Sequence, residues 1–172
     1  MSYFMFDVEA DGPCPHVYSM VCFGVVLVAD TTKTFYGQTY PISQNYKPES
    51  LAISGFTRQQ HEHFPLPGVT MPTFLEWAES VNEKGTKMVL ASDNTAWDYQ
   101  WLNYYLWRWC KRNPFGHSAR NINDVFHGMK MDMRASFKHL RKTNHDHNPI
   151  NDSMGNVEAL LAMQQQGLKI KL

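Results

Sequence analysis

Three apolar segments of strand length occupy the first forty residues of the chain. They run from Tyr3 to Val8, from Met20 to Ala29 and from Lys33 to Tyr40, and each contains aromatic or β-branched residues. Only the short Asp-Thr-Thr sequence at 30–32 separates the second segment from the third. Parallel neighbours need a crossover of about a dozen residues or more, so short links favour antiparallel pairing. These segments therefore predict an antiparallel meander.

Helix and strand patterns alternate in the rest of the chain, which is typical of an α/β domain with a mixed sheet. After loops and short helices between Pro41 and Val69, apolar spacing predicts a helix, a strand and a strongly aromatic helix that Asn94 is placed to cap. These elements are expected at Pro72 to Lys84, Lys87 to Ala91 and Thr95 to Lys111. Then follow a loop at 113–127 with a short strand or turn near Ile122, a helix from Met131 to Arg141 and a final helix from Asn151 to Gln166. We expect a five-stranded mixed sheet, an antiparallel meander plus parallel strands, flanked by helices.

Length and composition bound the class of protein. With 172 residues, 43% of them hydrophobic, we expect residues 1–172 to form a single domain. The longest mostly apolar run, Met20 to Ala29, is half of the about 20 residues that a membrane-spanning helix needs, and no basic residue precedes Lys33 as in a secretory signal. Three cysteines without CxxC spacing are typical of free thiols in a reducing compartment. These features predict a cytoplasmic protein that does not enter a membrane.

Two carboxylates stand at the end of the first predicted strand. Asp7 and Glu9 are two residues apart, so the period of a strand directs both to the same face of the sheet. Phe4 and Phe6 point to the opposite face, where we expect them in the core. Two anions placed together in this way need a cation or a proton between them.

Two further carboxylates and a histidine lie at predicted helix starts. Asp98 falls in the first turn of the aromatic helix, and Asp152 opens the last helix, five residues after His147. Four carboxylates from two strand positions and two helix N-termini would form an all-oxygen site suited to Mg²⁺ or Mn²⁺. His147 would then be free to act as a base.

Three segments resemble, in order and spacing, the exonuclease motifs of the DEDDh family of 3′–5′ exonucleases. They are Asp7-Val8-Glu9-Ala10-Asp11-Gly12, the run from Asn94 to Leu102, and the run from His147 to Asp152. The family includes proofreading exonucleases, ribonuclease T and oligoribonuclease. The resemblance spans nearly the whole chain and implies a ribonuclease H-like fold. It also implies stepwise release of 5′-nucleoside monophosphates from the 3′ end of single-stranded nucleic acid, RNA or DNA.

The resemblance implies a role for each motif residue. Asp7, Glu9 and Asp152 would bind one of two divalent ions, Mg²⁺ or Mn²⁺, Asp7 would bridge to the second, and Asp98 would complete the site directly or through water. His147 would be the general base. The positions expected to contact the terminal nucleotide are Ala10, Asp11, Gly12, Asn94, Phe56 and Tyr99. Ala10 and Asp11 stand where the family usually has two threonines, and a second histidine, His145, is too far from Asp152 to match the family spacing.

Several alternative interpretations stay open. The pairs His145-x-His147 and His61-x-His63 would suit zinc, but no cysteine pair lies near either, and loop positions explain His61 and His63. Nine basic and two acidic residues lie within 108–142, and Arg134, Lys138 and Arg141 would line one helix face, either for phosphates or simply in solvent. The aromatic helix contributes mainly to the core, with part of it available as a contact surface.

Two function classes follow from these features. The favoured one is a metal-dependent 3′–5′ exonuclease, and the alternative is a non-catalytic module that binds nucleic acid or a partner on the same fold. A binding module would not need a cluster of mutually repulsive carboxylates. No Gly-x-Ser-x-Gly element is present, which disfavours a serine hydrolase. A homodimer is possible for either class.

Overall fold

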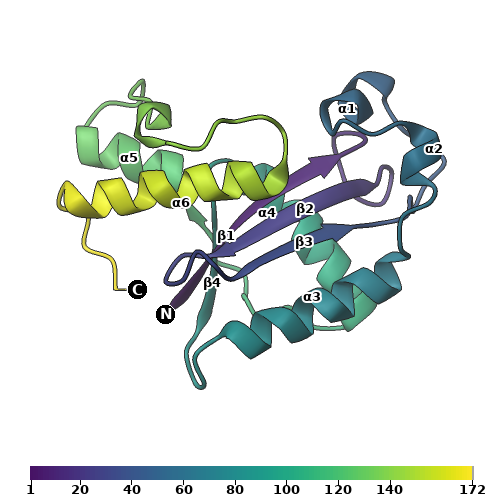
Figure 1. Ribbon diagram of the computed structural model, residues 1–172, viewed down its shortest axis with the longest axis horizontal. Helices are drawn as coiled ribbons and strands as arrows, with labels where there is room; N and C mark the ends of the chain where they lie inside the picture. The colour runs from purple at the N-terminus through teal and green to yellow at the C-terminus, as the bar shows by residue number, and fades with distance from the viewer. Residues whose placement is uncertain (172) are drawn as a thin grey trace.

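A mixed five-stranded sheet with helices on both faces forms the protein (Figure 1). The computed structural model describes residues 1–171. The strands are β1 (Ser2–Ala10), β2 (Met20–Leu27), β3 (Thr34–Gln38), β4 (Met88–Ser92) and β5 (Arg120–Asn121), in the order β3-β2-β1-β4-β5. β1, β2 and β3 pair antiparallel, whereas β4 pairs parallel to both β1 and β5. The predicted meander and mixed five-stranded sheet are confirmed.

Six α-helices and two short helical turns complete the described chain. They are α1 (Pro48–Ile53), α2 (Arg58–His61), α3 (Pro67–Val81), α4 (Thr95–Tyr105), the π-helical turn η1 (Leu106–Cys110), α5 (Ile122–Lys130), the 3₁₀ turn η2 (Lys138–Leu140) and α6 (Pro149–Gln165). The short helices before residue 70, the aromatic helix and the final helix are thus present. No helix within residues 1–171 is both long and apolar enough to cross a membrane.

Three helix predictions are wrong in detail. α3 begins at Pro67 rather than Pro72, which lies inside the helix. Asn94 occupies the N-cap position of α4, but its side chain accepts no hydrogen bond from the helix. The aromatic segment is not one α-helix to Lys111, because its last turn is π-helical and Lys111 adopts a positive φ of 59°.

The largest error concerns residues 113–141. β5 confirms the short strand expected near Ile122, but α5 forms where the loop was expected to continue, and the predicted helix from Met131 to Arg141 is absent except for the 3₁₀ turn η2. The side chain of Asn121 accepts hydrogen bonds from the N–H groups of Asn123 and Asp124 and so starts α5. Met131 ends it in the left-handed region at φ 51°. The signals for the helix are this cap and the apolar spacing of Ile122, Val125, Phe126 and Met129, which pack on the core with α6.

Alternate side chains of β1 enter two different cores. Phe4 and Phe6 pack with the buried residues of α3 and α4, including Phe74 and Trp101. Met5, on the other face, packs with α5 and α6 through residues such as Val157. Burial on both faces holds the strand rigidly, so the carboxylates at its end have little freedom to move apart.

Close backbone contact fixes the N-terminal end of α6 over β2. A Cβ on Gly24 would lie 2.3 Å from the carbonyl carbon of Pro149. The hydroxyl of Ser153 also donates to the Gly24 carbonyl over 3.2 Å. Only glycine permits this approach, and the contact sets where the first turn of α6 lies above the sheet.

Replacing Gly24 by alanine tests this contact. We expect Gly24→Ala to lower the free energy of unfolding by about 1–3 kcal/mol because the added methyl group overpacks the interface. Gly128→Ala is the matched control, since its Cβ meets nothing within 4 Å in α5. That variant should gain about 0.5–1 kcal/mol through helix propensity. Urea denaturation measures both, and equal stability of the two variants would contradict the close contact.

Candidate active site

Three carboxylates converge where β1 ends beneath the first turn of α6. Asp7 and Glu9 come from the same face of β1, and Asp152 comes from α6. One oxygen of each lies within 4.8 Å of the others. Asp152 is almost completely buried, and its Oδ2, like Oδ2 of Asp7, has no hydrogen-bond partner in residues 1–171. This geometry is that of an all-oxygen site for a divalent cation.

Asp98 joins the site from the opposite face of the sheet. It is buried in the first turn of α4, and its Oδ1 accepts a hydrogen bond of 3.0 Å from the Val8 N–H. It therefore holds the backbone between Asp7 and Glu9. Among the described residues, Asp98 does not belong to the close group of three oxygens. Its charge reaches the site nevertheless, because it raises the pKa of Asp7.

The cluster is electrostatically unfavourable without a cation. Burial, followed by the charges of Asp98, Glu9 and Asp152, raises the pKa of Asp7 well above its usual range. Burial and Asp152 raise the pKa of Glu9 to about 7, against the opposing effect of His145. Burial also raises the pKa of Asp98 strongly. Protons or cations must relieve this repulsion.

Two histidines face the carboxylates from the loop before α6. His147 adopts a positive φ of 60°, and its Nδ1 lies 3.4 Å from Oε1 of Glu9. His145 Nδ1 lies 2.7 Å from Oδ1 of Asp152. Both imidazoles are about half exposed, at 44% for His145 and 48% for His147. The geometry brings both histidines to the site, whereas the sequence spacing favoured His147 alone.

The loop that carries these histidines is tied to α6 and β4. Glu158 of α6 accepts hydrogen bonds from the N–H groups of Lys142 and Thr143. The Arg141 guanidinium is buried, pairs with Asp93 at 2.9 Å and donates to Asn156. The sequence analysis missed these supports, because no linear spacing relates partners that are 48 residues apart, as Arg141 and Asp93 are. The prediction that Arg141 lines an exposed phosphate-binding face is wrong.

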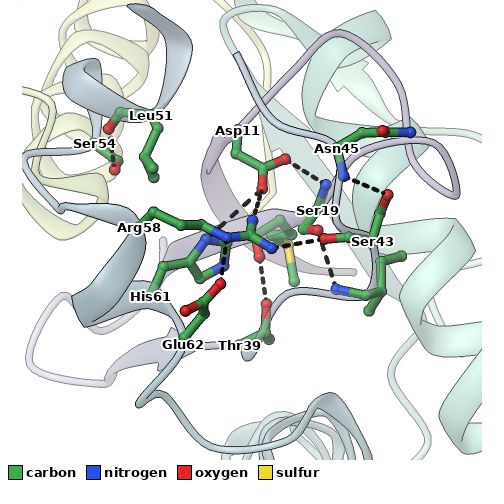
Figure 2. A network of polar contacts seen from close by, with 12 residues as sticks. Asp11, Ser19, Thr39, Ser43, Asn45, Leu51, Ser54, Arg58, His61 and Glu62 are labelled. Atoms are coloured by element: carbon green, nitrogen blue, oxygen red, sulfur yellow. Dashed lines mark hydrogen bonds and ion pairs between the residues drawn. The ribbon is translucent and has the colours of Figure 1, made fainter. Parts of the chain in front are cut away.

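A buried polar network occupies the position after Glu9 (Figure 2). Asp11 has no exposed surface, and its carboxylate accepts from the Ser19 N–H over 2.6 Å and from Arg58 over 3.1 Å. Burial raises the pKa of Asp11 to about 6, against these stabilising contacts. The Asp11 side chain therefore links α2 to the sheet, and the prediction that it contacts substrate is wrong for its carboxylate.

His61 belongs to the same network and is not a loop histidine. It ends α2 with no exposed surface, and its Nδ1 lies 3.7 Å from Oδ2 of Asp11. Burial and the neighbouring Arg58 lower the pKa of His61 to about 4, so the imidazole is neutral near pH 7. His61 is a core residue, and its pairing with His63 as a zinc motif is not formed.

The other predicted contact residues are dispersed around the site. Phe56 lines a cavity of about 180 Å³ together with His147, Tyr36 and Cys22. Tyr99 instead points to a neighbouring loop, where its hydroxyl donates to the Gly116 carbonyl. The remaining three lie close to the β1 end and the α4 start: Ala10 is buried, Gly12 lies against the ring of Tyr18, and Asn94 is exposed. Their contact with substrate stays a prediction.

Comparisons with known proteins agree with this fold. No family model matches the sequence. The 3′–5′ DNA exonuclease Cap18 of Escherichia coli is 28% identical over 177 aligned residues, which cover 96% of this chain and 93% of the relative. The nuclease domain of 3′hExo, a DEDDh family member solved with rAMP, superposes with a TM-score of 0.76 at 17% identity, covering 99% of this chain and 96% of that domain.

A larger enzyme shares the same fold over part of its length. Escherichia coli Exonuclease I, solved with a dA16 oligonucleotide, gives a TM-score of 0.73 at 14% identity, and the match covers 96% of this chain but 41% of that one. The predicted ribonuclease H-like fold and the resemblance to DEDDh-type 3′–5′ exonucleases are therefore confirmed.

Removing one charge from the cluster should stabilise the protein in a chelator. The raised pKa values of Asp7 and Glu9 mean that folded protein binds extra protons, so stability falls as the pH rises through about 7. Asp7→Asn should therefore raise Tm more at about pH 8 than at about pH 5, by about 2–4 °C for each kcal/mol of relieved repulsion. Scanning calorimetry in EDTA measures this, with the exposed Asp124→Asn as control. An equal Tm difference at both pH values would refute the electrostatic explanation.

Proposed function

We propose that residues 1–172 form a single exonuclease domain that hydrolyses single-stranded nucleic acid from its 3′ end and releases 5′-nucleoside monophosphates. One observation carries this proposal, namely the convergence of Asp7, Glu9 and Asp152 within 4.8 Å beside His147. The likeness to a named 3′–5′ exonuclease over 96% of the chain supports it.

The donor set fits two hard divalent cations, Mg²⁺ or Mn²⁺. Asp7, Glu9 and Asp152 would hold one ion, Asp7 would extend to the second, and Asp98 would contribute directly or through water. The buried oxygens Oδ2 of Asp7 and Asp152 have no hydrogen-bond partner among residues 1–171. This supports the fit, because a buried oxygen without a partner costs free energy unless a ligand binds to it. When bound, such ions polarise a phosphodiester and acidify a water molecule.

His147 is the group we assign to proton transfer. Its imidazole is about half exposed and lies at the edge of the carboxylate cluster, so it can receive a proton from an attacking water and pass it to solvent. The supports of its loop, Glu158 and Arg141, keep it at the cluster without taking part in the chemistry.

The cavity beside His147 is the place we propose for the terminal nucleoside. Its volume is about 180 Å³, and Phe56 offers an aromatic face at its wall. The curated relative is named a DNA exonuclease, so we propose single-stranded DNA as the first substrate to test, with RNA as the comparison. A homodimer stays a prediction that light scattering can test.

A non-catalytic binding module is the weaker alternative. The buried cluster raises the pKa values of three carboxylates, which destabilises the folded chain unless a cation is bound. A binding surface on the same fold would not require that cost. The alternative predicts retained binding with no hydrolysis, so the next experiment separates the two.

The first test of the proposed function is hydrolysis of 5′-labelled single-stranded DNA and the matching RNA. With Mg²⁺ or Mn²⁺ we expect products that shorten from the 3′ end, and EDTA should abolish them. Asp7→Ala and His147→Ala should each lower the rate by about a hundredfold or more, whereas the exposed control Asp124→Ala should not. Intact substrates with every metal, together with retained binding, would favour the non-catalytic module.

The second test concerns Phe56. If a base stacks on this ring, Phe56→Ala should raise KM by about fivefold to a hundredfold, equivalent to about 1–3 kcal/mol of stacking, with a smaller effect on kcat. Trp107→Ala is the matched aromatic control, because Trp107 is 55% exposed in the turn η1. Steady-state kinetics on a short oligonucleotide provide both constants, and an unchanged KM would remove Phe56 from the substrate site.

A further inference from the structure

Asp152 belongs to two different groups of potential metal ligands. The first is the all-oxygen group with Asp7 and Glu9. The second contains the imidazoles of His145 and His147, and one donor atom of each residue again lies within 4.8 Å of the others. The two groups share one buried carboxylate but differ in the chemistry of their remaining donors. This difference selects between classes of cation.

The histidine group is compact and open to solvent. His145 Nδ1 is 2.7 Å from Oδ1 of Asp152, and the two imidazole centroids are 4.6 Å apart with their planes at 61°. Both rings are about half exposed, so a cation can enter from solvent without a change in the fold. Asp152, at 1% exposure, forms the inner wall.

The loop around these histidines is built to keep them in place. The Asp146 N–H donates to Oδ1 of Asp152 over 3.2 Å. The Asp146 carboxylate in turn accepts from the Asn148 N–H and from the Asn151 amide, at 3.0 and 2.8 Å. Farther along the loop, Glu158 holds the backbone of Lys142 and Thr143. Few degrees of freedom remain to be lost when a metal binds.

Two imidazoles and one carboxylate are a preferred ligand set for zinc. Zinc binds such donors at about 2.0–2.2 Å in tetrahedral geometry, and three protein ligands leave one position for water. Neighbouring donors in that geometry are about 3.3 Å apart. The contact of 2.7 Å between His145 Nδ1 and Asp152 Oδ1 must therefore open slightly when the ion binds. Mg²⁺ and Mn²⁺ prefer oxygen ligands and so favour the other group.

The Asp152 carboxylate has acceptor capacity for this ion. Its Oδ2 is buried and has no hydrogen-bond partner among residues 1–171, and only 1% of the residue is exposed to solvent. A buried carboxylate oxygen in this state is costly unless a cation or a proton satisfies it. The observation is independent of the histidine spacing, and because Asp152 belongs to both groups it supports a cation in either of them.

We propose that His145, His147 and Asp152 form a binding site for Zn²⁺. Occupation of this site is incompatible with the arrangement proposed for hydrolysis, in which Asp152 binds with Asp7 and Glu9 and His147 is the base. An ion held there occupies the imidazole that we assign as the base and withdraws Asp152 from the all-oxygen group. Zinc should therefore bind to the protein and inhibit hydrolysis. The binding stands on the geometry alone, whereas the inhibition rests on the proposed function.

Zinc binding can be measured without any nuclease assay. Calorimetric titration should show one Zn²⁺ per chain for the natural protein and for Asp7→Asn, because Asp7 belongs only to the all-oxygen group. His145→Gln should weaken the affinity by at least about tenfold, whereas the control His117→Gln, an exposed loop histidine, should not. Equal affinity in His145→Gln and the natural protein would overturn the proposal.

X-ray absorption of the zinc-loaded natural protein provides a check that does not depend on a variant. We expect two imidazole ligands and oxygen in the remaining positions. Sulfur ligands would assign the ion to Cys14 or Cys110, the partly exposed thiols, and would overturn the proposal.

Inhibition is tested by adding Zn²⁺ to reactions that contain saturating Mg²⁺. For each protein the rate is compared with its own rate without zinc, and half-inhibition of His145→Gln should need at least about tenfold more Zn²⁺ than that of the natural protein. Equal sensitivity of the two would contradict the link between this site and inhibition. If neither protein hydrolyses nucleic acid with any metal, the proposed function fails while the zinc titration remains decisive for the site.

Discussion

The burial of several carboxylates at one end of β1 is the constraint on which the rest of the site depends. Like charges this close repel, and burial penalises their ionised forms, as the raised pKa values of Asp7, Glu9 and Asp98 record. Such a cluster persists only when packing elsewhere holds it together. The aromatic core under Phe4 and Phe6 on one face of β1, and the close approach of α6 at Gly24 on the other, supply that packing. The fold thus maintains a cation site that would otherwise separate.

Two ion pairs between residues far apart in the chain position the histidine loop and α2. Arg141 connects the histidine loop to Asp93 at the end of β4, and Arg58 connects α2 to Asp11 just after β1. Both guanidinium groups are largely shielded, which makes each pair costly to break on one side. The carboxylate of Asp11, two residues after Glu9, is buried, and its partners Ser19 and Arg58 tie it into a polar network (Figure 2). Phe56 and His147 line the cavity that we propose for the terminal nucleoside.

The antiparallel meander, the carboxylate pair on β1 and the three motifs were all predictable, because each depends on local periodicity, short links or fixed spacing. Strand alternation placed Asp7 and Glu9 on one face, and the helix starts placed Asp98 and Asp152. The segment from 113 to 141 was predicted wrongly although its signals are local, because the Asn121 cap and the apolar period from Ile122 to Met129 both indicate α5. Because only the turn η2 forms within 131–141, Arg134, Lys138 and Arg141 do not share a helix face, and Arg141 is buried.

The sequence by itself determined the sheet, the motifs and the identity of the groups that meet at the end of β1, because these follow from hydrophobic period and residue chemistry. Only the tertiary structure decided which side chains meet at the carboxylate cluster and which are buried in support of it. It buried Asp11 and His61 in a supporting network and set Asp98 behind the strand. It also brought His145 within 2.7 Å of Asp152, closer than the 3.4 Å that separate His147 from Glu9. These outcomes depend on contacts between residues far apart in the chain, and the free energy of such contacts comes from packing and burial that no local pattern specifies.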